Sequence, residues 1–535
     1  MELVYLWIED YKNIKRQGFT FSPRFKCEFK PKYNEKDELI PEESELIIEE
    51  KKDYVNIFPD NINVTAIVGK NGAGKSSVLE VFYGYLYAKE NRDNLNKCFI
   101  VCKDKNNKLF HITKKNIKSD YQYIEKEKFL NLSYSIFFDF TIFHTISNEG
   151  GEVYKKFYSI EPSRTFQTGN QISKVEPVSI HANLKMKSLY FYFLANENKN
   201  LLNKLNLPAI KKVKINNKKL LRDVKKIISI IETGLKNENL KGDNYQNFLK
   251  EILDKLNIIL KKGKKENHEN EITKIKDSIK NYFKLSQNDE QYILDTDFSF
   301  FKNKEDLIIL EILNNIFPVE LEFEYQEEYF TYSKLSTGQK IILSYIGIIA
   351  NNILLYCDGR KIKNIFIFLD EVETGFHPAF QKNLLFIFEN VLNIIFKEYN
   401  FSLFFLTHSP FILSDLPKEN IIFMKDGKNV SNEINIETFG ANIHTLLTHG
   451  FFMEDGLMGG YAKSKIDEVI KYLNNEESKI ASDEEAQKII NIIGEPIIKK
   501  ELQRKLDSKK LNKINEIEEK ITILKERLEI LRKNS

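Results

Sequence analysis

The chain has 535 residues, of which 42% are hydrophobic and 12% aromatic, so a disordered protein is excluded and two or three structural units are expected. The formal charge of +3 is close to neutral and does not by itself indicate a nucleic-acid-binding protein, so any basic surface must be local. The chain's 4 cysteines are too few for a disulfide framework. For Cys98 and Cys102, buried reduced thiols are the better interpretation and a zinc site the weaker one.

Two segments bear on localisation. The amino-terminal run MELVYLWIEDYK lacks a basic region followed by a long apolar stretch, so we do not expect a signal peptide. Residues 341–356 form the most apolar long segment, but they fall short of the roughly 20 residues that span a membrane, and Asn351 and Asn352 interrupt them. We therefore expect a buried helix there and a soluble cytoplasmic protein.

Residues 1–90 have the pattern of a sheet followed by a helix that begins at Gly74. Residues 95–142 alternate short apolar runs with polar turns, which predicts antiparallel strands. Together these segments predict an amino-terminal lobe over residues 1–145. The strands expected before the helix lie at residues 3–8, 19–21 and 63–68.

Residues 146–317 predict a mostly helical insertion, because long Lys-, Asn- and Glu-rich stretches carry apolar residues at helical spacing. Within it, residues 204–226 hold nine cations and a single anion, Asp223. A solvated helix face is the simpler interpretation of this basic segment, and a nucleic-acid contact is the alternative.

An α/β pattern returns over residues 318–460, which predict a carboxyl-terminal lobe. Near-continuous apolar runs at residues 364–370 and 401–407 are typical of parallel strands covered on both faces. Residues 461–535 predict a helical tail. Its apolar residues at 514, 517, 521, 524, 528 and 531 form a short seam with coiled-coil spacing, which predicts either a docking helix or a weak self-association helix.

One glycine-rich motif carries the clearest chemistry. The sequence GKNGAGKS matches the phosphate-binding P-loop pattern and lies between an expected strand and an expected helix. Its glycines let successive backbone N–H groups surround an anion at the positive end of a helix. Lys75 is expected to reach the β- and γ-phosphates of ATP, and the Ser76 hydroxyl to ligate Mg²⁺. The residues expected to contact the nucleotide here are Gly69, Lys70, Asn71, Gly72, Ala73, Gly74, Lys75, Ser76 and Ser77.

Two adjacent carboxylates end the apolar strand IFIFLDE, as in a Walker B motif. Asp370 is expected to hold Mg²⁺, directly or through water, and Glu371 to polarise the attacking water. His408 follows the next apolar strand, 38 residues after Asp370, and is predicted to contact the γ-phosphate. His377, in the turn after Glu371, faces a dimer partner in one interpretation and caps the loop in the other.

The segment LSTGQK, residues 335–340, lies at a turn that leads into a helix. Ser336, Gly338 and Gln339 would form a second anion site at that helix N-terminus. Because the chain has a single P-loop, we expect a second copy of the protein to use this signature motif against its own γ-phosphate, so that two ATP molecules lie between two subunits.

These four motifs, in this order and with a large insertion after the first, resemble the ABC-type ATPases of the RecF/SMC/OLD group over about residues 1–90 and 318–430. The resemblance implies an α/β head with a mixed sheet, interrupted by a helical insertion and followed by a helical tail. The opening IEDYKNI looks like that group's N-terminal strand motif and implies a nucleotide contact for Lys12. Gln167 and Gln171 are candidates for the group's magnesium-coordinating glutamine.

The stretches THSPFILSDLP, TFGANIHTLL and FFMEDGLMGG are more particular. They resemble the stand-alone ATPases of anti-phage systems, including the PtuA-like subunits of Septu and of some retrons. That resemblance implies a cytoplasmic partner with nuclease activity, such as an HNH nuclease. Beyond residue 430, Glu454 is not followed by the Asp-x-Asp of the Toprim nucleases, so we expect the chain not to cut DNA itself.

The resulting hypothesis is a homodimeric switch, or a higher oligomer, that hydrolyses ATP to ADP and phosphate with Mg²⁺ and regulates a separate nuclease. The alternative is a RecF-like ATPase that clamps or repairs DNA, with DNA as a partner. A transporter motor is a weaker third hypothesis, because such ATPases lack so large an insertion between the P-loop and the signature.

Overall fold

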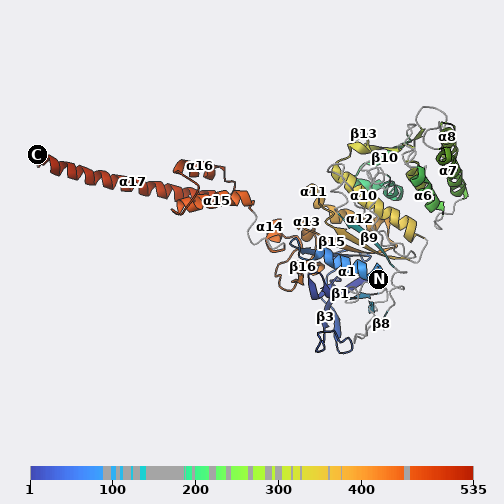
Figure 1. The fold of residues 1–535 in the computed structure, drawn as a ribbon, viewed down its shortest axis with the longest axis horizontal. Helices are drawn as coiled ribbons and strands as arrows, with labels where there is room; N and C mark the ends of the chain where they lie inside the picture. Colours follow the sequence, from blue (N-terminus) through green and yellow to red (C-terminus); the bar gives the residue numbers. More distant parts are fainter. Residues whose placement is uncertain are drawn as a thin grey trace. The chain divides into compact units, whose positions relative to one another are not determined.

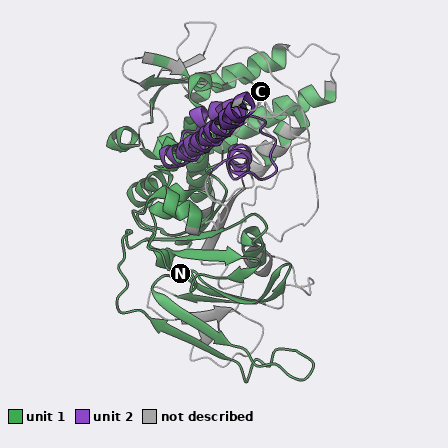
Figure 2. Ribbon diagram, turned by 90° about the vertical axis from the view of Figure 1, so that its left-hand side faces the viewer, with its two compact units in different colours: residues 1–452 green, residues 453–535 purple. Residues whose placement is uncertain are grey.

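The computed structural model divides the chain into two compact units, residues 1–452 and residues 453–535 (Figure 2). The described residues are 2–87, 98–103, 109–112, 122–123, 133–139, 186, 188–195, 199–205, 207–215, 224–235, 243–262, 269–283, 292–295, 304–314, 317, 319–325, 328–358, 362–374, 376–450 and 458–533. The first unit contains all four motifs, and its architecture is drawn in Figure 1.

A six-stranded sheet forms the centre of the first unit, in the order β17-β16-β5-β15-β14-β9. All neighbours in it are parallel except β17, which pairs with β16 antiparallel at one edge. Because the strands are parallel and in register, their carboxyl ends meet at one edge of the sheet. The strands are β5 (Ile62–Gly69), β9 (Ser133–Asp139), β14 (Asn364–Asp370), β15 (Asn400–Leu406), β16 (Ile421–Lys425) and β17 (Lys428–Asn429).

Both faces of this sheet are covered, as the continuous apolar runs predict. Alternate residues of a strand point to opposite faces. On β14, Ile365, Ile367 and Leu369 therefore join a core with helices α10 (Thr337–Asn352) and α12 (Leu384–Ile395). The intervening Phe366 and Phe368 join a second core with α1 (Lys75–Tyr87) and β1 (Glu2–Tyr11).

Strand β9 corrects one prediction. Residues 95–142 were expected to form antiparallel strands, and β6 (Cys98–Lys103) and β7 (Leu109–Ile112) do pair in that way. Residues 133–139, however, form β9, which lies parallel to β14 in the central sheet, with Asp139 opposite Asp370. The local alternation of apolar and polar residues could not reveal this pairing, because the partner strand lies more than two hundred residues further along the chain.

A second sheet, in the order β2-β1-β6-β7-β8 with β8 at Gln122–Tyr123, packs against α1 and the central sheet. β1 lies inside it, between β2 (Ile14–Thr20) and β6, and is buried along most of its length. The other face of this second sheet packs on a two-stranded ribbon of β3 (Phe25–Lys30) and β4 (Glu45–Glu50). Within β6, Cys98 and Cys102 are buried thiols, which confirms the interpretation of these residues as strand cysteines.

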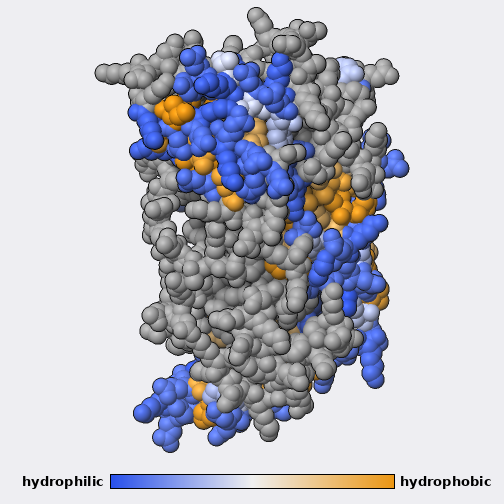
Figure 3. Space-filling view, turned by 90° about the vertical axis from the view of Figure 1, so that its right-hand side faces the viewer, coloured by the Kyte–Doolittle hydropathy of each residue, from blue (hydrophilic) through white to orange (hydrophobic). Residues whose placement is uncertain are grey.

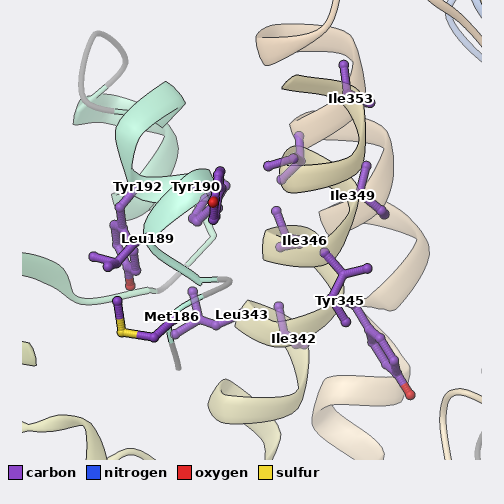
Figure 4. Packing of buried hydrophobic residues seen from close by; sticks show 14 of the residues in the cluster. Met186, Leu189, Tyr190, Tyr192, Ile342, Leu343, Tyr345, Ile346, Ile349 and Ile353 are labelled. Atoms are coloured by element: carbon purple, nitrogen blue, oxygen red, sulfur yellow. The ribbon is translucent and has the colours of Figure 1, made fainter. Parts of the chain in front are cut away.

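The expected insertion contains the helices α5 (Lys199–Lys204), α6 (Val224–Leu235), α7 (Asp243–Lys262), α8 (Glu269–Phe283) and α9 (Lys304–Leu313). It also contributes two strands, β10 (Ala209–Ile215) and β11 (Tyr292–Asp295), to a sheet with β12 (Val319–Tyr325) and β13 (Glu328–Thr331). Helical residues 188–195 pack on α10 in the same core, and Tyr190 and Leu343 lie on the facing sides (Figure 4).

Part of the basic segment, residues 204–226, is therefore strand β10, and the prediction of a helix was wrong there. In the antiparallel register, Lys212 stands opposite Glu322 and Lys214 opposite Glu320. Opposite charges at paired positions stabilise an antiparallel sheet. The register thus sets Lys positions of β10 against Glu positions of β12.

Hydrophilic side chains cover most of the described surface on the face shown in Figure 3, and apolar side chains form small separate patches. Over the described ranges, no helix is both long enough and apolar enough to cross a membrane. The second unit consists of α15 (Gly460–Leu473), α16 (Asp483–Ile492) and α17 (Pro496–Lys533). A small apolar core, which includes Ile466, Ile490 and Leu506, holds these three helices together.

Candidate active site

The P-loop connects β5 to α1, as predicted. Gly72 and Gly74 have positive φ angles of 79° and 103°, a backbone conformation that a side chain would strain. Asn13, from the turn between β1 and β2, donates from Nδ2 to the carbonyl oxygen of Gly72 at 3.0 Å. The loop is thus held by its own glycines and by a neighbouring turn. Sequence analysis did not identify Asn13, although the residue directly follows Lys12.

Lys75 begins α1 and lies over the loop. Its Nζ donates to the carbonyl oxygens of Gly69 at 3.1 Å and Lys70 at 3.3 Å, and it lies 2.7 Å from Nε2 of His408. Burial lowers the pKa of the Lys75 ammonium, and the nearby carboxylates of Glu371 and Asp370 oppose that shift. A buried cation with these neighbours can accept an anionic ligand at the loop.

Ser76 and Asp370 meet across the edge of the sheet. The Ser76 hydroxyl donates to Oδ2 of Asp370 at 3.2 Å, although the two residues come from opposite ends of the first unit's sequence. One oxygen belongs to the first turn of α1 and the other to the end of β14. A hydroxyl and a carboxylate oxygen are ligands of the type that Mg²⁺ prefers, so the donor set fits this ion.

Glu371 directly follows β14 and has a φ of +48°, in the left-handed region that residues other than glycine rarely adopt. Its N–H donates to the carbonyl oxygen of Leu406 at 2.8 Å, which fixes the turn to β15. The Glu371 carboxylate lies 3.4 Å from Nε2 of His408, and its side chain is 40% exposed. This strained turn therefore holds a carboxylate where water can reach it.

His408 follows β15, which lies directly between β5 and β14. The two strands that carry Asp370 and His408 are thus direct neighbours in the sheet. Burial lowers the pKa of His408, and the charge of Lys75 lowers it further, while Glu371 opposes both effects. Because an ammonium group can only donate, Nε2 accepts from Lys75, and the proton of the neutral ring lies on Nδ1.

Glu373 is a residue of the site that sequence analysis missed. Its side chain is buried, and its Oε1 accepts hydrogen bonds from the Thr407 hydroxyl and, at 3.1 Å, from the backbone N–H of His408. Burial raises the pKa of the Glu373 carboxyl. Glu373 thus connects the turn after β14 to the turn that carries His408. The sequence contained no signal for this role, because the two donors to Glu373 lie in the turn after β15, far along the chain from any local pattern.

The signature motif lies at the start of α10. Ser336 is the N-cap of this helix and forms a capping box with Gln339: the Ser336 hydroxyl accepts from the Gln339 N–H, and the Gln339 side chain accepts from the Ser336 N–H. Gly338 is buried, and a Cβ there would lie 2.8 Å from the Phe380 ring. Within the described part of the chain, the hydrogen bonds of the Ser336 and Gln339 side chains stay inside this turn and do not reach the P-loop.

A short helix, α11 (Pro378–Gln381), lies between the signature and the turn that carries His408. Phe380 packs at Gly338, and Gln381 accepts from the Ser409 hydroxyl at 2.9 Å. His377 is the N-cap of α11 and accepts from the Ala379 N–H at 3.3 Å. Within one chain, His377 therefore caps the loop, which is one of its two predicted roles.

Of the remaining predicted site positions, which lie outside the four motifs, the structure describes Lys12 only. Lys12 is half-exposed and pairs with Glu80 of α1, whose carboxylate also accepts from the Tyr11 hydroxyl at 3.0 Å. Its contact with a nucleotide stays a prediction. Gln167, Gln171 and residues 454–456 lie outside the described residues.

Residues 43–413 match the AAA ATPase domain family, and this span contains the P-loop, Asp370, Glu371 and His408. The chain belongs to the AAA ATPase domain family. Membership agrees with the geometry of the P-loop and with the α/β fold around it. Among solved structures, this AAA ATPase is similar to the ADP conformation of MJ1267, an ATP-binding cassette of an ABC transporter. The two share 13% sequence identity and a TM-score of 0.22 over 79% of this chain and 94% of that chain. No curated protein matches the sequence.

Proposed function

We propose that this AAA ATPase is an ATP-hydrolysing dimeric switch that regulates a separate nuclease subunit in anti-phage defence. One observation carries the proposal. Lys75, Asp370, Glu371 and His408 converge at one edge of the central sheet, whereas the signature motif caps its own helix and makes no hydrogen bond to that cluster among the described residues. Such a site holds the cation, the carboxylates and the histidine that phosphoryl transfer uses. The remaining contacts to the γ-phosphate would come from groups outside this cluster.

The residues of the cluster would divide the work as follows. Ser76 and Asp370 would hold Mg²⁺, which supplies neutralisation of phosphate charge when bound. Lys75 would exchange its contacts with the Gly69 and Lys70 carbonyls for phosphate oxygens. Glu371 would orient the attacking water and accept its proton at the exposed carboxylate.

His408 would change protonation during this cycle. In the structure, Nε2 accepts from Lys75. A phosphate anion next to the ring favours the form with a proton on Nε2, because an opposite charge stabilises imidazolium. Nucleotide binding would therefore convert His408 from an acceptor for Lys75 into a donor to the γ-phosphate.

The second subunit would complete the site. Ser336, Gly338 and Gln339 of one copy would contact the γ-phosphate bound by the other copy, through the backbone N–H groups at the start of α10. An ABC-type pair of this kind buries two nucleotides at an isologous interface. Closure and opening of that pair would be the signal to the effector.

The proposed effector follows from the resemblance of THSPFILSDLP, TFGANIHTLL and FFMEDGLMGG to the stand-alone anti-phage ATPases. The test is to express the wild type, Lys75→Ala and Glu371→Gln in the native cells, to purify each, and to identify the protein that co-purifies in stoichiometric amount. We expect a nuclease whose DNA cleavage differs between the wild type and Glu371→Gln in the presence of ATP. If no partner is present and Glu371→Gln instead retains DNA in an ATP-dependent manner, the RecF-like alternative replaces this proposal.

A further inference from the structure

The second half of α17 extends beyond the small core of the second unit. In the first half, Leu502 and Leu506 are buried against α15 and α16, and Lys513 still reaches Asp483 at 2.8 Å. From residue 514 to residue 532, every residue is exposed. An isolated helix of this length is only marginally stable in water, so a long exposed helix with apolar residues points to a covering partner.

Ile523 and Ile530 apart, the exposed apolar residues of this half follow coiled-coil spacing. They occur alternately three and four residues apart, which places them on one stripe in the a and d positions of a heptad. Their exposed fractions range from 44% for Ile521 to 69% for Leu531. We call this stripe the α17 seam; its residues are Ile514, Ile517, Ile521, Leu524, Leu528 and Leu531.

The residues that flank the α17 seam are mostly cations. In this register the g positions are Lys513, Lys520 and Arg527, and the e positions are Glu518, Lys525 and Arg532. The opposite side of the helix is acidic, with Glu516, Glu519, Glu526 and Glu529. The charge is therefore arranged around the seam, because the two signs occupy different faces of the same helix.

This arrangement disfavours a second copy of α17 as the covering helix. In a parallel pair, g residues face e residues of the other helix five positions on. Lys513 would then face Glu518 of the second copy, which is attractive. Lys520 would face Lys525, however, and Arg527 would face Arg532, so repulsive contacts outnumber attractive ones two to one. An antiparallel pair brings g positions together and places Lys520 beside Arg527. Like charges at such positions oppose association.

The acidic back of the helix also disfavours a nucleic acid as the partner. A helix that binds the phosphate backbone has to present cations broadly and without acidic neighbours. Here the cations form two narrow lines on either side of an apolar stripe, which a phosphate backbone would leave exposed. A protein helix would cover the stripe and pair with both lines at once.

We propose that the α17 seam binds an amphipathic helix of another protein, with Leu or Ile at its a and d positions and Asp or Glu at its e and g positions. The seam would supply the apolar contact, and the flanking Lys and Arg would select the acidic partner. This inference rests on the second unit alone. It does not depend on the ATP-driven switch proposed above.

The experiment uses the full chain and two designed peptides of about four heptads. Both carry Ile at a and Leu at d; one has Glu and the other Lys at every e and g position. We expect the full chain to bind the Glu peptide at least about tenfold more tightly in fluorescence anisotropy, with a difference that shrinks as salt rises. Equal affinity for both peptides, or no binding of either, would overturn the proposal.

Two variants distinguish binding through the α17 seam from binding through any other exposed part of the helix. Leu524→Asp places a charge in the seam, whereas Ile523→Asp places one outside it, on a residue exposed to a similar degree, 53% against 58%. We expect Leu524→Asp to lose the Glu peptide and Ile523→Asp to keep it, with ATP hydrolysis and the helix content by circular dichroism unchanged in both. Loss of binding in both variants would remove the seam as the contact.

A third variant tests the exclusion of a second copy. Lys520→Glu combined with Arg527→Glu turns both repulsive g–e contacts of a parallel pair into attractive ones. In sedimentation velocity without nucleotide, this double variant should self-associate more strongly than the wild type. The proposal is overturned if Leu524→Asp instead dissociates a wild-type oligomer, because the seam would then be a homotypic interface. It is equally overturned if the wild type binds a DNA duplex through Lys520 and Arg527 while ignoring the Glu peptide.

Discussion

The Nζ atom of Lys75 lies 2.7 Å from Nε2 of His408, so the P-loop cation and the histidine after β15 contact each other directly. Burial contributes most to the lowered pKa of His408, and the charge of Lys75 lowers that pKa further. A neutral imidazole can accept the ammonium proton, whereas an imidazolium would repel it.

The first prediction concerns this pair. In nucleotide-free protein, His408 should titrate below its ordinary pKa of 6.5 and stay neutral at pH 7. Lys75→Met removes the cation and should raise the His408 pKa, as measured by NMR of labelled histidine ring carbons. Lys70→Met, at an exposed loop position, serves as the control and should leave the titration unchanged. A His408 pKa that does not respond to Lys75→Met would show that the two groups are not coupled.

The second prediction concerns Glu373. Glu373→Ala leaves the buried Thr407 hydroxyl and His408 N–H without their acceptor, which should destabilise the protein by about 1–3 kcal/mol and lower hydrolysis. Glu373→Gln keeps an acceptor and should retain more activity. Thermal unfolding and steady-state hydrolysis measure both effects. Equal loss in the two variants would mean that the carboxylate acts by its charge.

The raised pKa of Glu373 adds a pH dependence to this prediction. A carboxyl whose folded pKa exceeds its unfolded value favours folding below the unfolded pKa, and that contribution is lost as pH rises through the folded pKa. The ordinary value is 4.5, so the loss falls above pH 4.5. Glu373→Gln should therefore gain stability relative to the wild type as pH rises through this window. Parallel pH profiles of the two melting temperatures would contradict the raised pKa.

The third prediction concerns the packing of the signature helix on α11. A Cβ at Gly338 would lie 2.8 Å from the Phe380 ring. Gly338→Ala should therefore overpack this contact and lower stability by about 1–3 kcal/mol. A second change, Phe380→Leu, should recover part of that loss in a double-mutant cycle, because the smaller side chain gives the methyl group room. Additive effects of the two changes would show that Phe380 does not confine position 338.

The fourth prediction concerns magnesium. Asp370→Asn removes the charge opposite the Ser76 hydroxyl, 3.2 Å away, and should raise the Mg²⁺ concentration for half-maximal hydrolysis by about tenfold or more. Glu371→Gln is the matched control, since it should slow hydrolysis without changing the Mg²⁺ dependence of ATP binding. An unchanged Mg²⁺ requirement in Asp370→Asn would place the ion elsewhere.

Sequence patterns located the P-loop, the strand that ends at Asp370 and the strand before His408, because each combines a local motif with a continuous apolar run. The same patterns misassigned β9 and β10. An alternating run does not specify its partner, and β9 pairs with a strand far along the chain, while β10 depends on the acidic strand β12.

The supporting residues of the site were less accessible from sequence than its motifs. Asn13 and Glu373 are common surface residue types, and neither occurs in a pattern that indicates burial or a backbone contact. Their roles arise from tertiary structure: Asn13 reaches the Gly72 carbonyl oxygen from another sheet, and Glu373 receives the His408 N–H from a neighbouring strand.

The proposed sharing of each ATP site between two subunits is tested most directly by mixing two inactive variants. Lys75→Ala should abolish nucleotide binding, and Ser336→Arg should block the partner's site; each alone should be inactive. In an equal mixture, half of the dimers contain both variants, and each of these has one intact site built from the two unaltered halves. Hydrolysis should then return to about a quarter of the wild-type rate. If the mixture stays as inactive as its components, or if a strictly monomeric wild type hydrolyses ATP at full rate, the shared site does not exist.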